Sequence, residues 1–307
     1  MIKNKYIFFV FFLLAISAVF SQIGNYNHYP TMTPTHILDE KLTDISFAIS
    51  MRVLESNYNG PLLRLRRSSD NAERDFGWGD NDKIDVDAII KWSGEDNVFI
   101  HTWYDQSGLN RNAVQTNPAF QPEFVFQNIS VFRLRSDGVD DHLIIDTPNG
   151  IQDVTNQGNQ GTVITLALAT KKGEEQGSFG VVDKFDNRWS AHINHGDSKF
   201  YFDPGNCCPE PRSFENKSGE GKWKVYTLIK TSNRSIARRE GVEMFNGDYT
   251  GRCTLTLDFA IGCINGNNGP NQVFGTTGFN EFIMYKTNID PIQYQEIEQS
   301  LMAFWRN

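Results

Sequence analysis

The sequence predicts an all-β protein, a jelly-roll sandwich of two antiparallel sheets that carries a short C-terminal helix. Aromatic residues make up 13% of the 307 residues, and 25 glycines accompany them, a mixture that suits short strands joined by turns. Apolar and β-branched residues recur in short runs between turn formers, and only two stretches show helical spacing. A hydrophobic fraction of 39% supports a sizeable core and excludes a disordered chain.

The strands are expected where alternating or β-branched residues are bounded by turn formers. The clearest runs cover residues 98–104, 162–169, 199–202, 225–229, 254–261 and 279–285. No repeat period and no linker interrupt the chain after residue 36, so one domain over residues 37–307 is expected. So many short strands in one domain favour two packed sheets.

Two segments have the spacing of a helix. The first covers residues 85–92. In the second, Asp290 can cap the helix and Pro291 suits its first position. Apolar residues then recur at helical spacing, at Ile297, Leu301 and Phe304 or Trp305. We expect this last helix to pack its apolar stripe on the sheet.

The first 21 residues have the features of an export signal. Lys3 and Lys5 precede an apolar run over residues 6–20, and small residues stand before the expected cleavage at Gln22. A membrane anchor is the alternative, but fifteen apolar residues fall short of the roughly 20 needed to span a bilayer. Residues 22–36 are expected to form a flexible leader. We therefore expect a secreted, periplasmic or cell-surface protein with no transmembrane segment after cleavage.

The charge balance argues against nucleic acid as a partner. The chain has 37 Asp and Glu against 29 Lys and Arg, a formal net charge of -8, and no long cationic cluster. Nothing in the sequence has the form of a phosphate-binding loop or a nucleophile elbow.

Two polar stretches carry a specific pattern. Residues 64–73 read Arg-Leu-Arg-Arg-Ser-Ser-Asp-Asn-Ala-Glu, and residues 103–108 read Trp-Tyr-Asp-Gln-Ser-Gly. With residues 58–61, they resemble the opening of the arabinofuranosidase B catalytic domain and of secreted bacterial proteins with a concanavalin A-like lectin/glucanase domain. Residues 137–143 and 274–305 are similar to the later part of such laminin-G-like sandwiches. The resemblance implies a concanavalin A-like fold and a polysaccharide or oligosaccharide partner.

The Trp103, Tyr104 and Asp105 group permits two interpretations. After a strand, Asp105 and Ser107 can bond nearby backbone amides and form a structural turn. Alternatively, the two rings and the carboxylate line a sugar site, since aromatic faces stack on sugar rings and a carboxylate accepts from hydroxyls.

The four cysteines also leave two pairings open. Cys207 and Cys208 are adjacent, and they could pair separately with Cys253 and Cys263 as staples between strands. The resemblance instead implies a Cys207–Cys208 disulfide that faces the sugar, with Asp203 of the same stretch as a further substrate-binding residue. No histidine lies near enough in sequence to suggest a zinc site.

A retaining glycosidase needs two carboxylates about 5–5.5 Å apart. The resemblance makes Glu215 the counterpart of the family's nucleophile, but places Ile264 where the family's acid/base aspartate stands. Isoleucine can neither donate nor accept a proton, so another acid, such as Asp258 or Glu281, would have to replace it.

Metal binding is the remaining chemistry. Asp137, Asp140 and Asp141 supply hard oxygen ligands in a turn and could hold Ca²⁺, although a turn with bonded backbone amides explains them as well. His192 and His195, with Asp197, could bind a metal or provide a general base. No other cofactor is expected.

Three functions remain open at this stage. The first is carbohydrate recognition, and the second is a glycan-cleaving enzyme of the same fold, either an arabinofuranosidase-like hydrolase or a lyase or dehydratase with a His or Tyr base. The third is a cell-surface adhesion module. Two carboxylates, or a His/Tyr pair beside an Arg, converging in one cleft would favour the enzyme.

Overall fold

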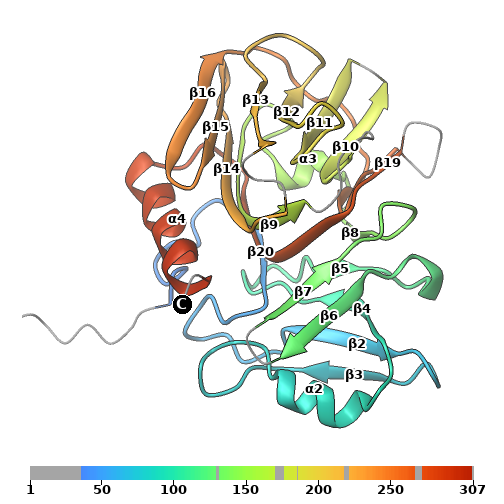
Figure 1. Ribbon diagram of the computed structural model, residues 1–307. Coiled ribbons are helices and arrows are strands. Elements are labelled where there is room, and N and C mark those ends of the chain that lie inside the picture. Colours follow the sequence, from blue (N-terminus) through green and yellow to red (C-terminus); the bar gives the residue numbers. More distant parts are fainter. Residues whose placement is uncertain are drawn as a thin grey trace, which may run out of the picture. The chain divides into compact units, whose positions relative to one another are not determined.

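Antiparallel strands dominate the computed structural model, which describes residues 36–128, 131–169, 176–184, 186–217, 221–266 and 272–305. The expected signal peptide, residues 1–21, and all but the last residue of the expected leader lie outside the described residues. The described residues confirm the predicted all-β sandwich with its C-terminal helix (Figure 1).

One layer consists of six strands in the order β16–β15–β14–β9–β20–β1, each antiparallel to its neighbour. Their bounds are β1 (Ile45–Ser50), β9 (Gly161–Ala169), β14 (Lys224–Lys230), β15 (Arg234–Arg239), β16 (Val242–Asp248) and β20 (Thr277–Tyr285).

The other layer follows the pairings β13–β12–β11–β10–β17–β8–β5–β4–β2–β3. Its bounds are β2 (Leu63–Arg67), β3 (Glu73–Phe76), β4 (Val98–Trp103), β5 (Ala113–Val114), β8 (Leu143–Ile145), β10 (Phe179–Lys184), β11 (Asn187–His192), β12 (Lys199–Gly205), β13 (Ser213–Glu215) and β17 (Phe259–Ile261). Strands β6 (Glu123–Asn128) and β7 (Val131–Arg135) connect β4 to β20. Strands β18 (Cys263–Ile264) and β19 (Val273–Phe274) form a separate small pair.

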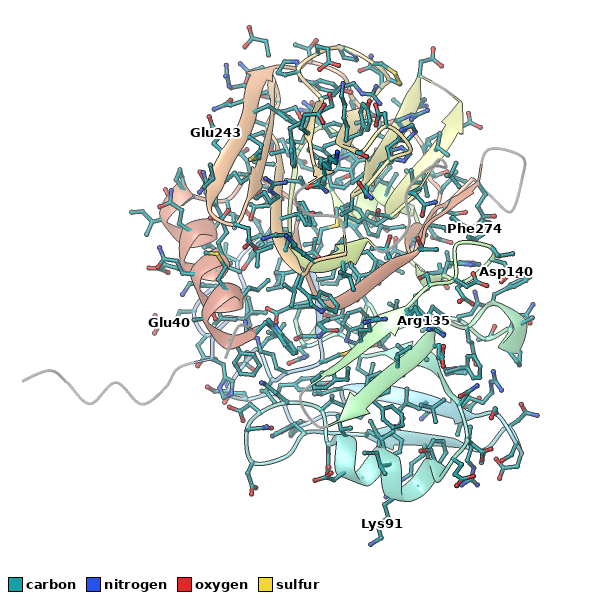
Figure 2. The ribbon with its side chains drawn as sticks, viewed as in Figure 1. Glu40, Lys91, Arg135, Asp140, Glu243 and Phe274 are labelled. Carbon is teal, nitrogen blue, oxygen red and sulfur yellow. A yellow bond between two sulfur atoms is a disulfide. The ribbon has the colours of Figure 1, made fainter. Side chains whose placement is uncertain are left out.

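Side chains that alternate along the central strands supply two hydrophobic clusters. On β9, Val163 and Ala167 belong to the main core between the layers, while Ile164 and Leu166 face a second cluster. Ile297 and Leu301 of the C-terminal helix complete that second cluster, so the helix covers the outer face of β9 and its neighbours. Figure 2 shows the side chains that fill the space between the strands.

Both predicted helices are present, and the first, expected over residues 85–92, is shifted by one residue. Helix α2 (Val86–Ser93) is capped by Asp85, whose Oδ1 accepts from the Ala88 amide at 2.9 Å. Helix α4 (Pro291–Trp305) begins with Pro291, and Oδ1 of Asp290 accepts from the Ile292 amide at 2.8 Å. The short elements are α3 (Ile151–Val154) and the 3₁₀ turn η1 (Pro118–Phe120). Within the described ranges, no helix combines the length and apolar character needed to cross a bilayer.

One predicted strand is shorter than expected. Residues 254–258 form no ladder, and β17 begins only at Phe259. The Thr254 amide instead donates to the side-chain oxygen of Asn187 at 3.2 Å, so the β propensity of this run does not produce strand pairing.

Candidate functional site

A pocket of about 210 Å³ lies beside the Cys207–Cys208 loop at the hairpin of β11 and β12. The hairpin register places His192 directly opposite Tyr201, and His195 stands in the turn between the two strands. Across strands, opposed side chains lie on the same face, which is why two residues nine apart in sequence meet here. The lining residues are Arg188, His192, His195, Tyr201, Cys207, Cys208 and Arg212.

Cys207 and Cys208 form a disulfide with each other, while Cys253 and Cys263 are free thiols buried in the interior. The structure thereby selects the adjacent pairing and excludes the separate staples. The disulfide lines the pocket and presents polarisable sulfur, an apolar contact surface, to whatever occupies it.

His192 is buried on β11, and its Nδ1 lies 2.9 Å from the carbonyl oxygen of Gln176. A carbonyl oxygen can only accept, so Nδ1 carries the proton and Nε2 keeps its lone pair. Burial, reinforced by the neighbouring His195, lowers the pKa of His192 to about 3. The ring therefore stays neutral near pH 7 and offers one acceptor nitrogen.

Asp197 links a histidine to a tyrosine. Its Oδ1 lies 3.4 Å from Nδ1 of His195, and its Oδ2 accepts from the Tyr201 hydroxyl at 2.5 Å. Burial and this hydrogen bond raise the pKa of Tyr201 to about 12. Burial opposes the shift at Asp197, but hydrogen bonds from Tyr201 and the Lys199 backbone still lower the pKa of that carboxyl. Near pH 7, a protonated phenol and an imidazole thus share one ionised carboxylate.

Arg212 supplies positive charge to the same pocket. Its Nε and Nη2 donate to the two carboxylate oxygens of Asp203, at 2.6 and 2.8 Å, and its guanidinium lies 4.4 Å from the centre of the Tyr201 ring. Arg188 lies 3.6 Å from the same carboxylate. Nη1 of Arg212 makes no hydrogen bond to the residues that the structure describes, so it can donate to a bound molecule.

Asp203, expected to contact substrate, is completely buried behind Arg212. It therefore positions the arginine and does not itself line the pocket. The expectation of direct contact is corrected, because the bidentate pair occupies both carboxylate oxygens.

The Trp103 and Asp105 contacts contradict their expected sugar-binding role. Trp103 is completely buried in the main core. Asp105 is also buried, and its carboxylate accepts from the amides of Ala48, Ser107 and Arg111 at 2.8 to 3.0 Å, which is the structural-turn interpretation. Strand β4 lies at the opposite end of the described strands from β12 (Figure 1).

Tyr104 is half-buried and does not line the pocket beside the disulfide. Its hydroxyl donates to Asp75 at 2.8 Å, and burial together with that bond raises the pKa of Tyr104 to about 12. Asp75 is in turn held by Arg64. Tyr104 thus belongs to a surface network on β3 and β2, not to the pocket.

The two expected catalytic glutamates do not converge. Glu281 is completely buried on β20, where it accepts from Nε and Nη2 of Arg52 at 2.7 and 2.9 Å and from the Trp305 indole at 2.9 Å. Glu215 is exposed on β13, opposite Lys199 of β12. Neither lines the pocket, so the expected carboxylate pair is corrected: Glu281 is a structural ion-pair residue.

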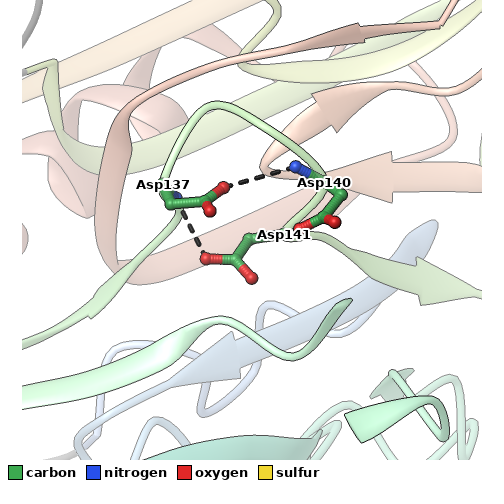
Figure 3. A group of neighbouring side chains, drawn as sticks. All are labelled: Asp137, Asp140 and Asp141. Carbon is green, nitrogen blue, oxygen red and sulfur yellow. Dashed lines mark hydrogen bonds between the residues drawn. The ribbon is translucent and has the colours of Figure 1, made fainter. Parts of the chain in front are cut away.

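The three aspartates of the expected calcium site do lie together. Carboxylate oxygens of Asp137, Asp140 and Asp141 lie within 4.8 Å of one another (Figure 3). Asp137 accepts from the Asp140 amide at 3.3 Å, and Asp141 accepts from the Asp137 amide at 3.0 Å. Burial, then the Asp137 charge, raises the pKa of Asp141 to about 7. A divalent cation would relieve this repulsion, and the calcium site stays a prediction.

Sequence reasoning considered the two histidines of the pocket but missed Tyr201, Arg188 and Arg212. A signal was available, because residues 187–192 and 199–205 flank a short polar turn and predict a hairpin that opposes His192 to Tyr201. Arg212 carried no such signal, since its approach to the pocket depends on the chain path after the disulfide.

No protein-family model and no curated protein sequence matches the chain. Among solved structures, it resembles a glutamate-to-glutamine variant of a GH54 α-L-arabinofuranosidase soaked with 4-nitrophenyl α-L-arabinofuranoside, with a TM-score of 0.66 at 14% identity. It also resembles the GH54 enzyme soaked with a cyclic sulfate inhibitor, with a TM-score of 0.65 at 14% identity. An arabinofuranosidase complexed with arabinofuranosyl-α-1,2-xylobiose gives a TM-score of 0.63 at 13% identity.

Each of these three matches covers 87% of this chain and 64% of the other chain. At such identities the likeness establishes a shared fold. The chain therefore has the β-sandwich architecture of these arabinofuranosidases and spans 64% of their length.

Proposed function

We propose that the protein is a glycan-cleaving enzyme that acts on a uronate-containing polysaccharide by β-elimination in the Cys207–Cys208 pocket. One observation carries the proposal: His195, Tyr201 and Arg212 line a single pocket together with a sulfur surface. A His/Tyr pair beside an arginine can supply the base, the acid and the positive charge for proton abstraction next to a carboxylate.

The pocket suits one sugar unit. Its volume of about 210 Å³ is below the roughly 300–1,000 Å³ of pockets for drug-sized ligands. The sulfurs of Cys207 and Cys208 offer an apolar wall for the C–H face of a sugar ring, while the histidines, the tyrosine and the arginines surround the polar edges. The ligands named for the structurally similar enzymes are saccharides, which supports a saccharide partner here.

The chemistry needs a base, an acid and a cation. Nε2 of His195, whose Nδ1 faces Asp197, takes the proton from C5 of the uronate. The C5–H electron pair forms the C4=C5 double bond, the C4–O bond breaks, and the leaving oxygen takes the proton of the Tyr201 hydroxyl. Nη1 of Arg212 stabilises the negative charge that develops on the uronate carboxylate. Water returns the proton from His195 to Tyr201, which restores the enzyme.

A two-carboxylate hydrolysis has less support. Among the described residues, no Asp or Glu lines the pocket. The position that resembles the arabinofuranosidase nucleophile holds the exposed Glu215, and the position that resembles its acid/base holds the buried Ile264. A retaining mechanism would need two carboxylates about 5–5.5 Å apart at the sugar.

The test is a panel of polysaccharides that contains polygalacturonate, alginate, arabinan and arabinoxylan. Purified protein is scored for bound polysaccharide, for new reducing ends and for the ultraviolet absorbance of unsaturated ends. We expect unsaturated ends from a uronate polymer, and their loss in His195→Gln, with Glu215→Gln as the matched control that keeps them.

Other outcomes separate the alternatives. If new reducing ends form without unsaturated ends, and Glu215→Gln no longer forms them, the protein is a hydrolase and not a lyase. Binding without any product would reduce the function to carbohydrate recognition. Failure to bind every polysaccharide would leave an adhesion module whose partner is a protein.

A further inference from the structure

Two further hollows lie near the Cys207–Cys208 loop, and neither shares a lining residue with the pocket. The first, of about 450 Å³, is lined by Gly205, Asn206 and Pro209 of that loop. The second, of about 360 Å³, shares Arg252 with the first. The disulfide loop thus separates the pocket from the first hollow, and Arg252 separates the first hollow from the second.

One chain segment contributes to both hollows. Arg252, Thr254 and Thr256 are exposed and line the second hollow, while Cys253 between them is completely buried and Leu255 packs against the core. This alternation is typical of an extended chain. It places one guanidinium and two hydroxyls in an outward row, about 13 Å from the first to the last residue.

The row is held in place by neighbouring side chains. Nε2 of Gln152, at the start of α3, donates to the Cys253 carbonyl at 3.0 Å. Asn187 of β11 donates to Oγ1 of Thr254 at 3.0 Å and accepts from its amide at 3.2 Å. A surface fixed in this way loses little conformational entropy when a ligand binds.

The row is also connected to the disulfide loop. The Tyr249 hydroxyl accepts from the amide of Asn206 at 2.9 Å and donates to the carbonyl of the same residue, next to Cys207. Gly251 lies against Asn206 so closely that a Cβ there would be 1.8 Å from Oδ1 of that residue. Arg252, which follows Gly251, therefore lies beside the disulfide loop, and it lines the first hollow together with Asn206.

We propose that the row Arg252, Thr254 and Thr256 binds the continuing chain of an oligosaccharide whose reacting unit occupies the Cys207–Cys208 pocket. The ligand is accordingly a saccharide of several units and not a simple glycoside, an assignment that rests on the proposed function. Threonine hydroxyls, the amide of Asn187 and the arginine offer donors and acceptors for sugar hydroxyls, and Arg252 can pair with a further uronate. The first hollow carries both signs of charge, since Asp186 and Asp248 line it beside Arg252, which suits a hydroxylated chain better than a simple anion.

The experiment measures affinity by calorimetry across a size series. The probes are dimers to hexamers prepared from polygalacturonate and alginate, with arabino- and xylo-oligosaccharides as neutral series. Three proteins are compared: wild type, Arg252→Ala/Thr256→Ala in the row, and Arg74→Ala. Arg74 is an exposed arginine on β3 that lines neither hollow, and it serves as the matched control.

We expect the hexamer to bind wild type and Arg74→Ala roughly tenfold more tightly than the dimer does. This ratio corresponds to about two additional net hydrogen bonds. In the double variant that ratio should fall to about one. An equal ratio in the double variant and wild type would overturn the proposal, as would the absence of any gain with chain length.

The outcomes also distinguish this proposal from the proposed function. A chain-length gain that the double variant loses, without unsaturated product, would support the row and overturn the lyase. Unsaturated product from a uronate polymer, without a gain in affinity with chain length, would support the lyase and overturn the row. Failure of all four series to bind would overturn both.

Discussion

The guanidinium of Arg212 is joined to the carboxylate of Asp203 by two hydrogen bonds, of 2.6 and 2.8 Å, at the base of the Cys207–Cys208 pocket. The side chain of Asp203 is completely buried, whereas that of Arg212 keeps 14% of its surface exposed toward the pocket side. The buried carboxylate holds one edge of the guanidinium, and the other edge is left for a ligand. The same pair therefore stabilises the fold and positions a binding group.

Replacement of Arg212 should cost stability. Among the described residues, Arg212→Ala leaves the buried Asp203 with Arg188, 3.6 Å away, as its remaining cation, so we expect the free energy of unfolding to fall by about 3 kcal/mol. Arg234→Ala is the control, because Arg234 pairs with the exposed Asp248 and should lose about 1 kcal/mol or less. Urea denaturation measures both, and equal losses would contradict the role given to the pair.

The two glutamates should respond in opposite ways. Glu281→Gln removes the charge that compensates the buried Arg52, and we expect a loss of about 3 kcal/mol. Glu215→Gln changes an exposed side chain and should stay within about 0.5 kcal/mol of wild type. Thermal denaturation compares the two, and a folded Glu281→Gln protein of wild-type stability would refute the structural role of Glu281.

The disulfide pattern predicts a labelling result. In unfolded protein without reductant, iodoacetamide should modify Cys253 and Cys263 alone, and after reduction all four cysteines. In the native protein neither free thiol should react, because burial raises the pKa of each to about 12. Peptide mass spectrometry assigns the labels, and modification of Cys207 or Cys208 before reduction would refute the adjacent pairing.

His192 should make the protein less stable in acid. An unfolded histidine titrates near 6.5, whereas burial lowers the pKa of native His192 to about 3. Between these values the unfolded chain binds a proton that the native protein does not, so stability falls as the pH drops, by up to about 1.4 kcal/mol per pH unit. His192→Gln should flatten the slope between pH 6.5 and 4 in urea titrations. An identical slope in the variant would contradict the neutral buried ring.

Asp141 should have the opposite dependence on pH. Its pKa is raised from 3.8 to about 7, so the native state keeps a proton that the unfolded chain loses, and stability falls as the pH rises from about 4 to 7. Asp141→Asn should be more stable than wild type at pH 8, by on the order of 1 kcal/mol after solvent screening. Calcium chloride should raise the melting temperature of wild type and not of the variant. Asp146→Asn, at an exposed aspartate, serves as the control. An equal gain in stability at pH 8 in that variant would refute the prediction.

The sequence by itself determined the elements whose causes are local. Asp85 and Asp290 cap helices because an aspartate oxygen reaches an amide two or three residues ahead, and no other part of the chain is needed. Runs of alternating or β-branched residues bounded by turn formers likewise predicted β4, β9, β14 and β20. The run at residues 254–258 shows the limit of this reasoning, because its residues alternate in exposure yet form no ladder, and the Thr254 amide bonds to the side chain of Asn187.

Only the tertiary structure decided which polar groups meet. Trp103 and Glu281 stand in motifs that suggest function, yet both are buried, and β20 is buried along its whole length so that alternation there carries no information. Tyr201 and Arg212 gained their places from hairpin register and from the path of the chain after the disulfide. Secondary structure follows from the residues next in sequence, whereas a site depends on contacts between residues that are distant in sequence, and those are set by the packing of the whole core.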